Sequence, residues 1–125
     1  MGRKFIQLAD TPKYPLSSGV RAGDFIFVSG QVGFVDPKTG RELKSIEAQT
    51  AQCLENMKAV LEAVGSAMTD VVKVNIYLKN AADFEKMNKV YKKYFAKNLP
   101  ARCTVVPALT QAKMLIEIEC VAYSP

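Results

Sequence analysis

The feature that most constrains this fold is a strand-like stretch with apolar side chains on both of its faces. The segment from Phe25 to Val32 begins Phe-Ile-Phe-Val and is almost continuously apolar up to Ser29. Successive side chains of a strand point to opposite faces of a sheet, so a run of this kind is typical of a strand buried on both faces. The fold must therefore cover a sheet from two sides.

Shorter patterns predict the other strands. Apolar residues alternate with polar ones at Val72, Val74, Ile76 and Leu78, which indicates a strand with one apolar face. Further strands are expected at 4–8, 103–106 and 113–123, and Pro107 marks a strand end or a bulge because it lacks a backbone donor. Residues 11–15 are expected to be irregular, 20–24 to form a turn and 36–40 to form a loop.

Two helices are predicted from apolar side chains that recur at spacings of three and four. The first begins at the capping residue Ser45, runs to about Val64 and is ended by Gly65; its stripe is Leu54, Met57, Leu61 and Val64. The second spans about 82–96 and is ended by Asn98 and Pro100; its stripe is Phe84, Met87, Tyr91 and Tyr94 or Phe95.

The predicted order is β-β-β-α-β-α-β-β, with the first element the least defined. Right-handed crossovers would place both helices on one face of the sheet. We therefore expect residues 1–125 to form a single α+β domain, a mixed β-sheet with two helices packed on one face. The other face would carry either Phe25 and Phe27 or Ile26 and Val28. Because large exposed apolar patches usually mark interfaces, the pattern predicts an oligomer.

Composition excludes several classes of function. The chain has no histidine, which excludes a Ser-His-Asp triad, a Cys-His dyad and a histidine-bearing zinc site. No phosphate-binding or dinucleotide-binding glycine motif is present. The three cysteines, Cys53, Cys103 and Cys120, form no CxxC pair, and the odd number argues against a disulfide framework. We expect no metal, no cofactor and hydrolysis of an already reactive substrate.

Hydropathy and charge indicate where the protein is located and what its surface binds. No apolar run is long enough to span a membrane and no apolar signal region follows the basic start, so a cytoplasmic protein is expected. The net charge is +5, and lysines concentrate in the second helix at 86, 89, 92, 93 and 97. These lysines favour a solvated helix face over a nucleic-acid surface.

An arginine and a glutamate near the end of the chain are the candidate reactive pair. Pro100-Ala101-Arg102 opens one late strand, and Ile116-Glu117-Ile118-Glu119 lies in the next. Arginine can hold a substrate carboxylate bidentately, and glutamate can accept a proton or orient a water. From the pair alone, the alternative is a structural ion pair.

Five short segments together resemble the RidA (YjgF-type) imine/enamine deaminase family in order and spacing, over nearly the whole chain from about Tyr14. They are Ser29-Gly30-Gln31, Val71-Val72-Lys73-Val74, Asp83-Phe84 with Asn88, Pro100-Ala101-Arg102 and Ile116-Glu117-Ile118-Glu119. The resemblance implies a chorismate-mutase-like fold and a homotrimer with a central β-barrel and sites in clefts between subunits. The implied activity is hydrolysis of 2-imino or 2-enamino acids, such as 2-aminoacrylate and 2-aminocrotonate, to 2-keto acids and ammonia.

The resemblance also implies roles for individual residues. Arg102 would clamp the substrate carboxylate, aided by the backbone amide near Thr104, and Glu117 would position the attacking water, with proton shuttling as a further role. Glu119 shares a face with Glu117, so the choice between them rests on the resemblance. The remaining residues expected at the site are Ser29, Gly30, Gln31, Asn88 and Cys103. Asn88 could equally be a surface residue, and Cys103 has a weaker case for thiol reactivity beside Arg102.

The sequence departs from the family pattern in its N-terminal loop. Family members commonly carry Gly-Pro-Tyr, whereas this chain has Tyr14-Pro15-Leu16, so Leu16 takes the place of a pocket tyrosine. Either Tyr14 reaches the pocket, or the pocket lacks that hydroxyl. Milder departures are the Cys103-Thr104 pair and the loop from Pro107 to Gln111. The alternative functions are an RNA-binding protein, weak endoribonuclease or translation inhibitor, and a non-catalytic ligand-binding or chaperone-like trimer.

Overall fold

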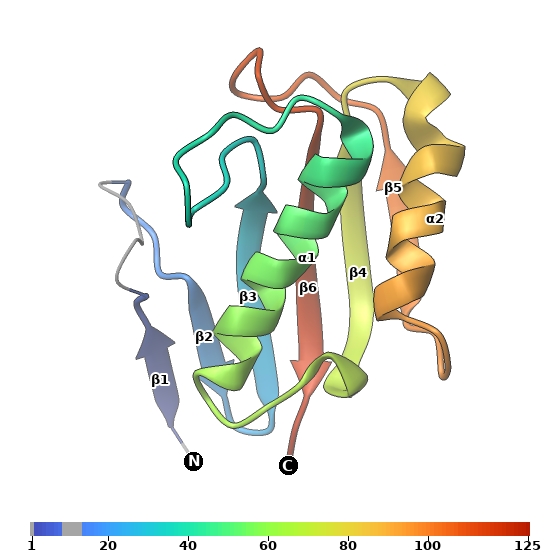
Figure 1. Ribbon diagram of the computed structural model, residues 1–125. Coiled ribbons are helices and arrows are strands. Elements are labelled where there is room, and N and C mark those ends of the chain that lie inside the picture. Colours follow the sequence, from blue (N-terminus) through green and yellow to red (C-terminus); the bar gives the residue numbers. More distant parts are fainter. Residues whose placement is uncertain (1, 9–13) are drawn as a thin grey trace.

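One mixed six-stranded sheet forms the body of the computed structural model, which describes residues 2–8 and 14–125 (Figure 1). The strands are β1 (Arg3–Ile6), β2 (Gly19–Ala22), β3 (Phe25–Val32), β4 (Val71–Leu78), β5 (Ala101–Val105) and β6 (Ile116–Tyr123). Their spatial order is β1-β2-β3-β6-β4-β5. Only β4 and β5 run parallel; the other neighbours are antiparallel. The predicted mixed sheet and the order of elements are confirmed.

Two helices cover one face of this sheet, as predicted: α1 (Ile46–Glu62) and α2 (Phe84–Tyr94) (Figure 1). Ser45 caps α1, because its Oγ accepts a hydrogen bond of 3.1 Å from the Ala48 N–H. Gly65 adopts a φ of 76° just beyond the helix. The Gly65 and Ser66 N–H groups then donate to the last free carbonyls of α1, a Schellman ending that only glycine adopts at low cost.

The core lies between the helices and the sheet. The inner face of the sheet contributes Ile26, Val74, Ile76 and Ile118, which are completely buried. They pack against the apolar stripe of α1 and against Met87 of α2. Burial of large apolar side chains is the main stabilising contribution to a domain of this size, so the two predicted stripes account for the position of both helices.

Several predicted boundaries were wrong by a few residues, and one turn was wrong in kind. Residues 19–22 form β2, and only Gly23 and Asp24 make the turn, with Gly23 at a φ of 60°. Gly19–Ala22 has no apolar alternation; it is a strand because it pairs with both β1 and β3. The first strand ends at Ile6, the last begins at Ile116, and β5 ends at Val105, two residues before Pro107. Of the predicted irregular segment, residues 11–13 lie outside the described residues.

Within the described residues, the opposite face of the sheet carries no helix (Figure 1). Phe5, Phe25, Phe27 and Tyr123 lie on it and are 44–60% exposed. The rings of Phe25 and Tyr123 are in contact across β3 and β6, with centroids 5.2 Å apart. We refer to this surface of four aromatic side chains as the open face. None of the helices in the described residues is long and apolar enough to cross a membrane.

Candidate functional site

Arg102 and Glu117 lie on opposite faces of the sheet within one chain. Arg102 is in register with Val74, a buried residue of the helix-covered face. Glu117 is in register with Tyr77 on the other face. The candidate reactive pair that the sequence placed on two consecutive strands is therefore not brought together within a single chain. The physical reason is the strand order, since β4 separates β5 from β6.

Arg102 is held in a fixed orientation by α2. Its Nη1 donates a hydrogen bond of 2.8 Å to the Oδ1 of Asn88, and its guanidinium carbon lies 4.9 Å from the ring centroid of Tyr91 and 5.6 Å from that of Phe84. These contacts are those of a guanidinium stacked on aromatic faces. Asn88 is therefore a partner of Arg102 and not an isolated surface amide.

No carboxylate forms an ion pair with Arg102 within the described part of the chain. The ion pair found there joins Lys113 and Glu42. The alternative of an ion pair between Arg102 and Glu117 or Glu119 is therefore wrong for this subunit. A guanidinium has several N–H donors, and Asn88 occupies one of its terminal nitrogens. The remaining donors can bind an anion bidentately.

The Glu117 carboxylate occupies the space that a side chain at position 30 would fill. A Cβ built on Gly30 would stand 2.1 Å from Glu117 Oε2 and 2.9 Å from its Cδ. No hydrogen bond to the carboxylate occurs in residues 2–8 and 14–125. Burial, and then the nearby Glu119 charge, raise the pKa of Glu117 above its ordinary value. Glu117 is thus a free carboxyl group with an increased proton affinity.

Glu119, two residues further along β6, is already engaged. Its Oε2 accepts hydrogen bonds from the Tyr77 hydroxyl and, at 3.3 Å, from Asn75 Nδ2. The bond to Glu119, followed by burial, raises the pKa of Tyr77 to about 12. Between the two glutamates that the sequence left open, Glu117 is therefore the one whose oxygens are available to another molecule.

A pocket of about 370 Å³ opens beside these glutamates. Its lining residues are Gly30, Tyr77, Glu117, Glu119 and the loop residues Pro107, Ala108, Leu109 and Thr110. The pocket therefore combines a free carboxyl group and a hydroxyl with an apolar loop. Tyr77 was not predicted for the site. It can be placed there only when the pairing of β4 with β6 is known, and the residue pattern of β4 does not reveal that pairing.

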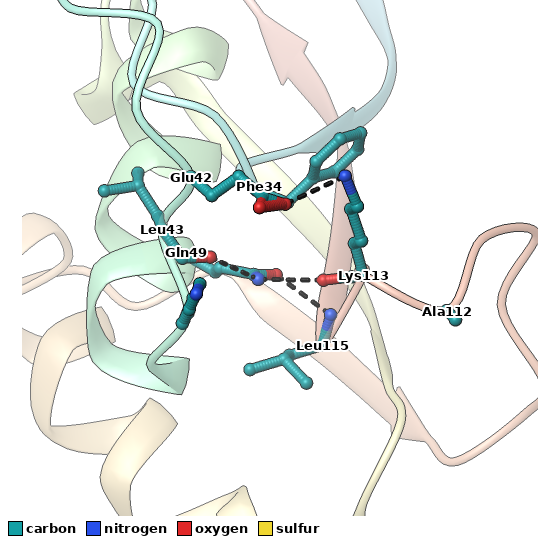
Figure 2. A pocket seen from close by; sticks show the side chains of 8 residues that line it. Phe34, Glu42, Leu43, Gln49, Ala112, Lys113 and Leu115 are labelled. Atoms are coloured by element: carbon teal, nitrogen blue, oxygen red, sulfur yellow. Dashed lines mark hydrogen bonds and ion pairs between the residues drawn. The ribbon is translucent and has the colours of Figure 1, made fainter.

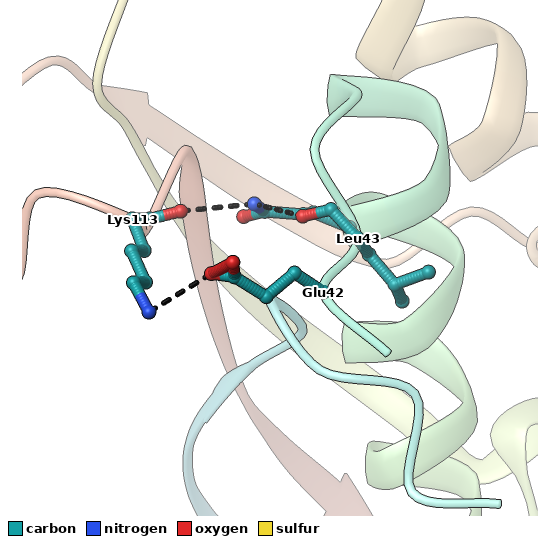
Figure 3. A network of polar contacts seen from close by, with 4 residues as sticks. Glu42, Leu43 and Lys113 are labelled. Atoms are coloured by element: carbon teal, nitrogen blue, oxygen red, sulfur yellow. Dashed lines mark hydrogen bonds and ion pairs between the residues drawn. The ribbon is translucent and has the colours of Figure 1, made fainter. Parts of the chain in front are cut away.

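A second pocket, of about 260 Å³, shows how the loop after β5 is anchored (Figure 2). Gln49 of α1 is completely buried at its edge; its Nε2 donates to the carbonyls of Leu43 and Lys113, and its Oε1 accepts from the Leu115 N–H, at 2.8–2.9 Å. The exposed Lys113–Glu42 ion pair, at 2.9 Å, lies beside this network (Figure 3). Gln49 therefore connects the helix to both loops, and its fully used amide marks a structural role.

The other residues predicted for the site are dispersed. The Ser29 hydroxyl donates to the Ser17 carbonyl at 2.6 Å, and Gln31 Nε2 donates to the Ser29 carbonyl at 3.0 Å. Cys103 is exposed and lies on the face opposite to Arg102, although the two are adjacent in sequence. Thr104 lies on the same face as Arg102. Its Oγ1 and the hydroxyl of Tyr91 are buried, and neither has a hydrogen-bond partner among the residues that the structure describes.

Tyr14 and Leu16 lie in the N-terminal loop, where both are exposed and the Leu16 N–H donates to the Tyr14 carbonyl. Neither lines the pocket beside Glu117 in a single chain. Within residues 2–8 and 14–125, no group of three or more acidic or cysteine side chains is arranged to hold a metal ion.

Comparison with known proteins gives consistent matches over nearly the whole chain. The family model described as Endoribonuclease L-PSP matches residues 7–124. A RutC family protein of Pyrococcus horikoshii is 48% identical over 95% of this chain and 94% of its own. A 2-iminobutanoate/2-iminopropanoate deaminase of Salmonella typhimurium is 39% identical over 86% of both chains. The structure of Escherichia coli TdcF with bound serine superposes with a TM-score of 0.89 at 31% identity, covering 98% of this chain and 99% of that one.

Proposed function

This chain belongs to the YjgF/RidA family, and on that premise we propose that it is a cofactor-independent deaminase of 2-imino and 2-enamino acids. The single observation that carries the proposal is the state of Arg102. Its guanidinium is held by Asn88 and two aromatic rings but has no carboxylate partner within the described residues. An oriented cation without a counterion is suited to binding the carboxylate of a small acid.

The reaction consumes one water and involves no net oxidation. The oxygen of water attacks C2 of the imine, the C=N electron pair moves to nitrogen, and a carbinolamine forms. The C–N bond then breaks as the hydroxyl oxygen forms the C=O bond. Ammonia leaves and a 2-keto acid remains. An enamine substrate first takes a proton at carbon to become the imine.

Two residues divide the work in this proposal. Arg102 holds the carboxylate and so fixes C2. Glu117 orients the attacking water, accepts one of its protons and returns a proton to the departing nitrogen. A general acid or base is most effective when its pKa lies close to the working pH, so the raised pKa of Glu117 suits both transfers.

The opposite-face geometry leads us to propose that each site forms between two copies of the chain. Arg102 belongs to β5, which is an edge strand, so a neighbouring copy can lie beside it. Glu117 opens toward the uncovered side of the sheet, where the open face also requires a partner. A homotrimer with its sheets facing inward, which the family resemblance implies, would satisfy both requirements.

An RNA-directed activity is the second candidate, because the matching family model is described as an endoribonuclease. The lysines at positions 86, 89, 92, 93 and 97 are all exposed, as expected for either a solvated or a binding face. Phosphate contacts made by lysine weaken steeply with salt. RNA binding that persists at low salt and disappears at high salt would favour this candidate.

The proposed function is tested by 2-keto-acid release from 2-aminoacrylate or 2-aminocrotonate, generated in situ by a serine or threonine dehydratase. We expect the wild type to accelerate release, Arg102→Ala and Glu117→Gln each to fail, and Arg41→Ala, an exposed loop variant, to behave as wild type. Mixing the two inactive variants after unfolding and refolding together should restore part of the activity, since some interfaces then combine an intact Arg102 with an intact Glu117. Absence of acceleration by the wild type refutes the deaminase. Inactive single variants that gain no activity on mixing refute the shared site, and an active single variant refutes the role assigned to the residue that it replaces.

A further inference from the structure

Tyr77 connects the two glutamates of the pocket in a way that the proposed reaction does not yet use. Tyr77 and Glu119 lie on adjacent strands, β4 and β6, and face the same side of the sheet as Glu117. The Tyr77 hydroxyl has one hydrogen-bond partner in the described residues, the Oε2 of Glu119. Asn75 donates to the same oxygen. Glu119 is therefore bound by two donors of β4 while Glu117 has none.

We propose that Tyr77 is a positioning residue that fixes Glu119 as a hydrogen-bonded carboxylate, and thereby makes Glu117 the only carboxyl group of the pocket that exchanges a proton with substrate. This inference rests on the proposed function, and it assigns the division of labour within the acidic pair. Two hydrogen bonds from β4 hold the Glu119 carboxylate in a fixed position. Its neighbour on the same strand face then bears the cost of the like charge.

The surroundings of Glu117 agree with this assignment. The titratable groups that act on it or respond to it are Glu119 from its own strand, Tyr77 from β4 and the buried thiol of Cys53 from α1. The thiol is held neutral, since burial and then the charge of Glu117 raise its pKa. β3 contributes Gly30, which carries no charge. Glu119 is thus the one charged group that faces Glu117 within the described residues.

Geometry also explains why the roles of the two glutamates do not exchange. Gly30 leaves the space that the Glu117 carboxylate occupies, and a larger residue at position 30 would displace that carboxylate. Glu119 is instead directed to the Tyr77 hydroxyl. Two chemically identical side chains on one strand are thereby given different surroundings.

The experiment compares Tyr77→Phe and Glu119→Gln with a matched control, Tyr94→Phe. Tyr94 donates to Glu55 at 2.7 Å, so the control removes the same type of bond between α1 and α2, away from the pocket. The titration of Glu117 is followed by NMR of side-chain carboxyl carbons in protein labelled with ¹³C-glutamate. Folding is checked by circular dichroism for each variant.

We expect the titration midpoint of Glu117 to move to lower pH in both pocket variants and to stay in place in the control. Glu119→Gln removes the like charge, and Tyr77→Phe releases the Glu119 carboxylate from its fixed position beside Glu117. The acid limb of the kcat/KM profile should move in the same direction. An unchanged midpoint in Tyr77→Phe overturns the inference. Shifted midpoints without deamination by any form, the wild type included, support the positioning pair and refute the proposed function instead.

Discussion

Replacing Gly30 by alanine tests the link between the sheet and the reactive carboxyl group most directly. The new Cβ would stand 2.1 Å from Glu117 Oε2, 2.9 Å from its Cδ and 3.2 Å from its Cγ. Ordinary van der Waals contact begins at 3.4 Å. The carboxylate must therefore retreat by more than 1 Å.

The expected loss of function follows from that displacement. A reacting group misplaced by about 1 Å can lose roughly 10²-fold in rate, so we expect kcat/KM of Gly30→Ala to fall by about 10²-fold. Stability should change little, because the atoms that must move are the end of a flexible side chain. Gly30 is also not among the glycines with positive φ, so alanine meets no backbone strain there.

The matched control is Gly33→Ala, in which the clash falls on backbone. The Cβ at position 33 would stand 2.5 Å from the Gln49 carbonyl oxygen and 3.0 Å from the Cys53 nitrogen, both in the backbone of α1. The helix would have to shift away from β3, and overpacking of this type typically costs about 1–3 kcal/mol. Steady-state kinetics and thermal unfolding of both variants decide the matter. Wild-type kcat/KM in Gly30→Ala, or a loss of stability there as large as in Gly33→Ala, would refute the reasoning.

Three further predictions concern single side chains. Arg102→Lys should lower kcat/KM by roughly 10- to 100-fold without lowering the melting temperature, because the point charge of lysine cannot form the bidentate contact and a hydrogen bond to a charged group is worth ~1.5–3 kcal/mol. Near-normal kinetics would show that Arg102 does not clamp the substrate carboxylate. Gln49→Leu leaves three partly buried backbone groups without their present partners and should cost about 3 kcal/mol of unfolding free energy in urea titrations. Glu42→Gln, which removes only an exposed ion pair, should leave the denaturation midpoint unchanged, and equal effects of the two variants would contradict this ranking. Thr50→Val removes a fully buried hydroxyl that has no hydrogen-bond partner in the described part of the chain, and it should raise the free energy of unfolding by about 1 kcal/mol, measured by calorimetry. A destabilised variant would indicate that the hydroxyl is satisfied, for example by a buried water.

The sequence predicted those parts of the fold whose cause is local. The cap of α1 at Ser45 and its ending at Gly65 each depend on residues close in sequence, and both predictions were confirmed. The apolar stripes also placed both helices on the sheet. By contrast, β2 has no alternation of its own and exists because two other strands pair with it.

The site was less predictable because its geometry depends on strand order. The sequence places Arg102 and Glu117 on consecutive strands, but in the sheet β4 lies between those two strands. Side chains also alternate between the two faces along each strand, and Arg102 and Glu117 fall on different faces. Tyr77 was missed for the same reason, since its contact with Glu119 spans 42 positions in the sequence.

The proposed association through the open face would make the stability of this chain depend on its concentration. Covering a large apolar side chain fully is worth roughly 1.5–3 kcal/mol, and a single copy leaves Phe5, Phe25, Phe27 and Tyr123 44–60% exposed. Association that covers them acts as ligand binding to the folded state, so by mass action the melting temperature should rise as the protein is concentrated. Dilution would have the opposite effect, because dissociated copies would expose the apolar open face. We expect such copies to aggregate before unfolding is complete.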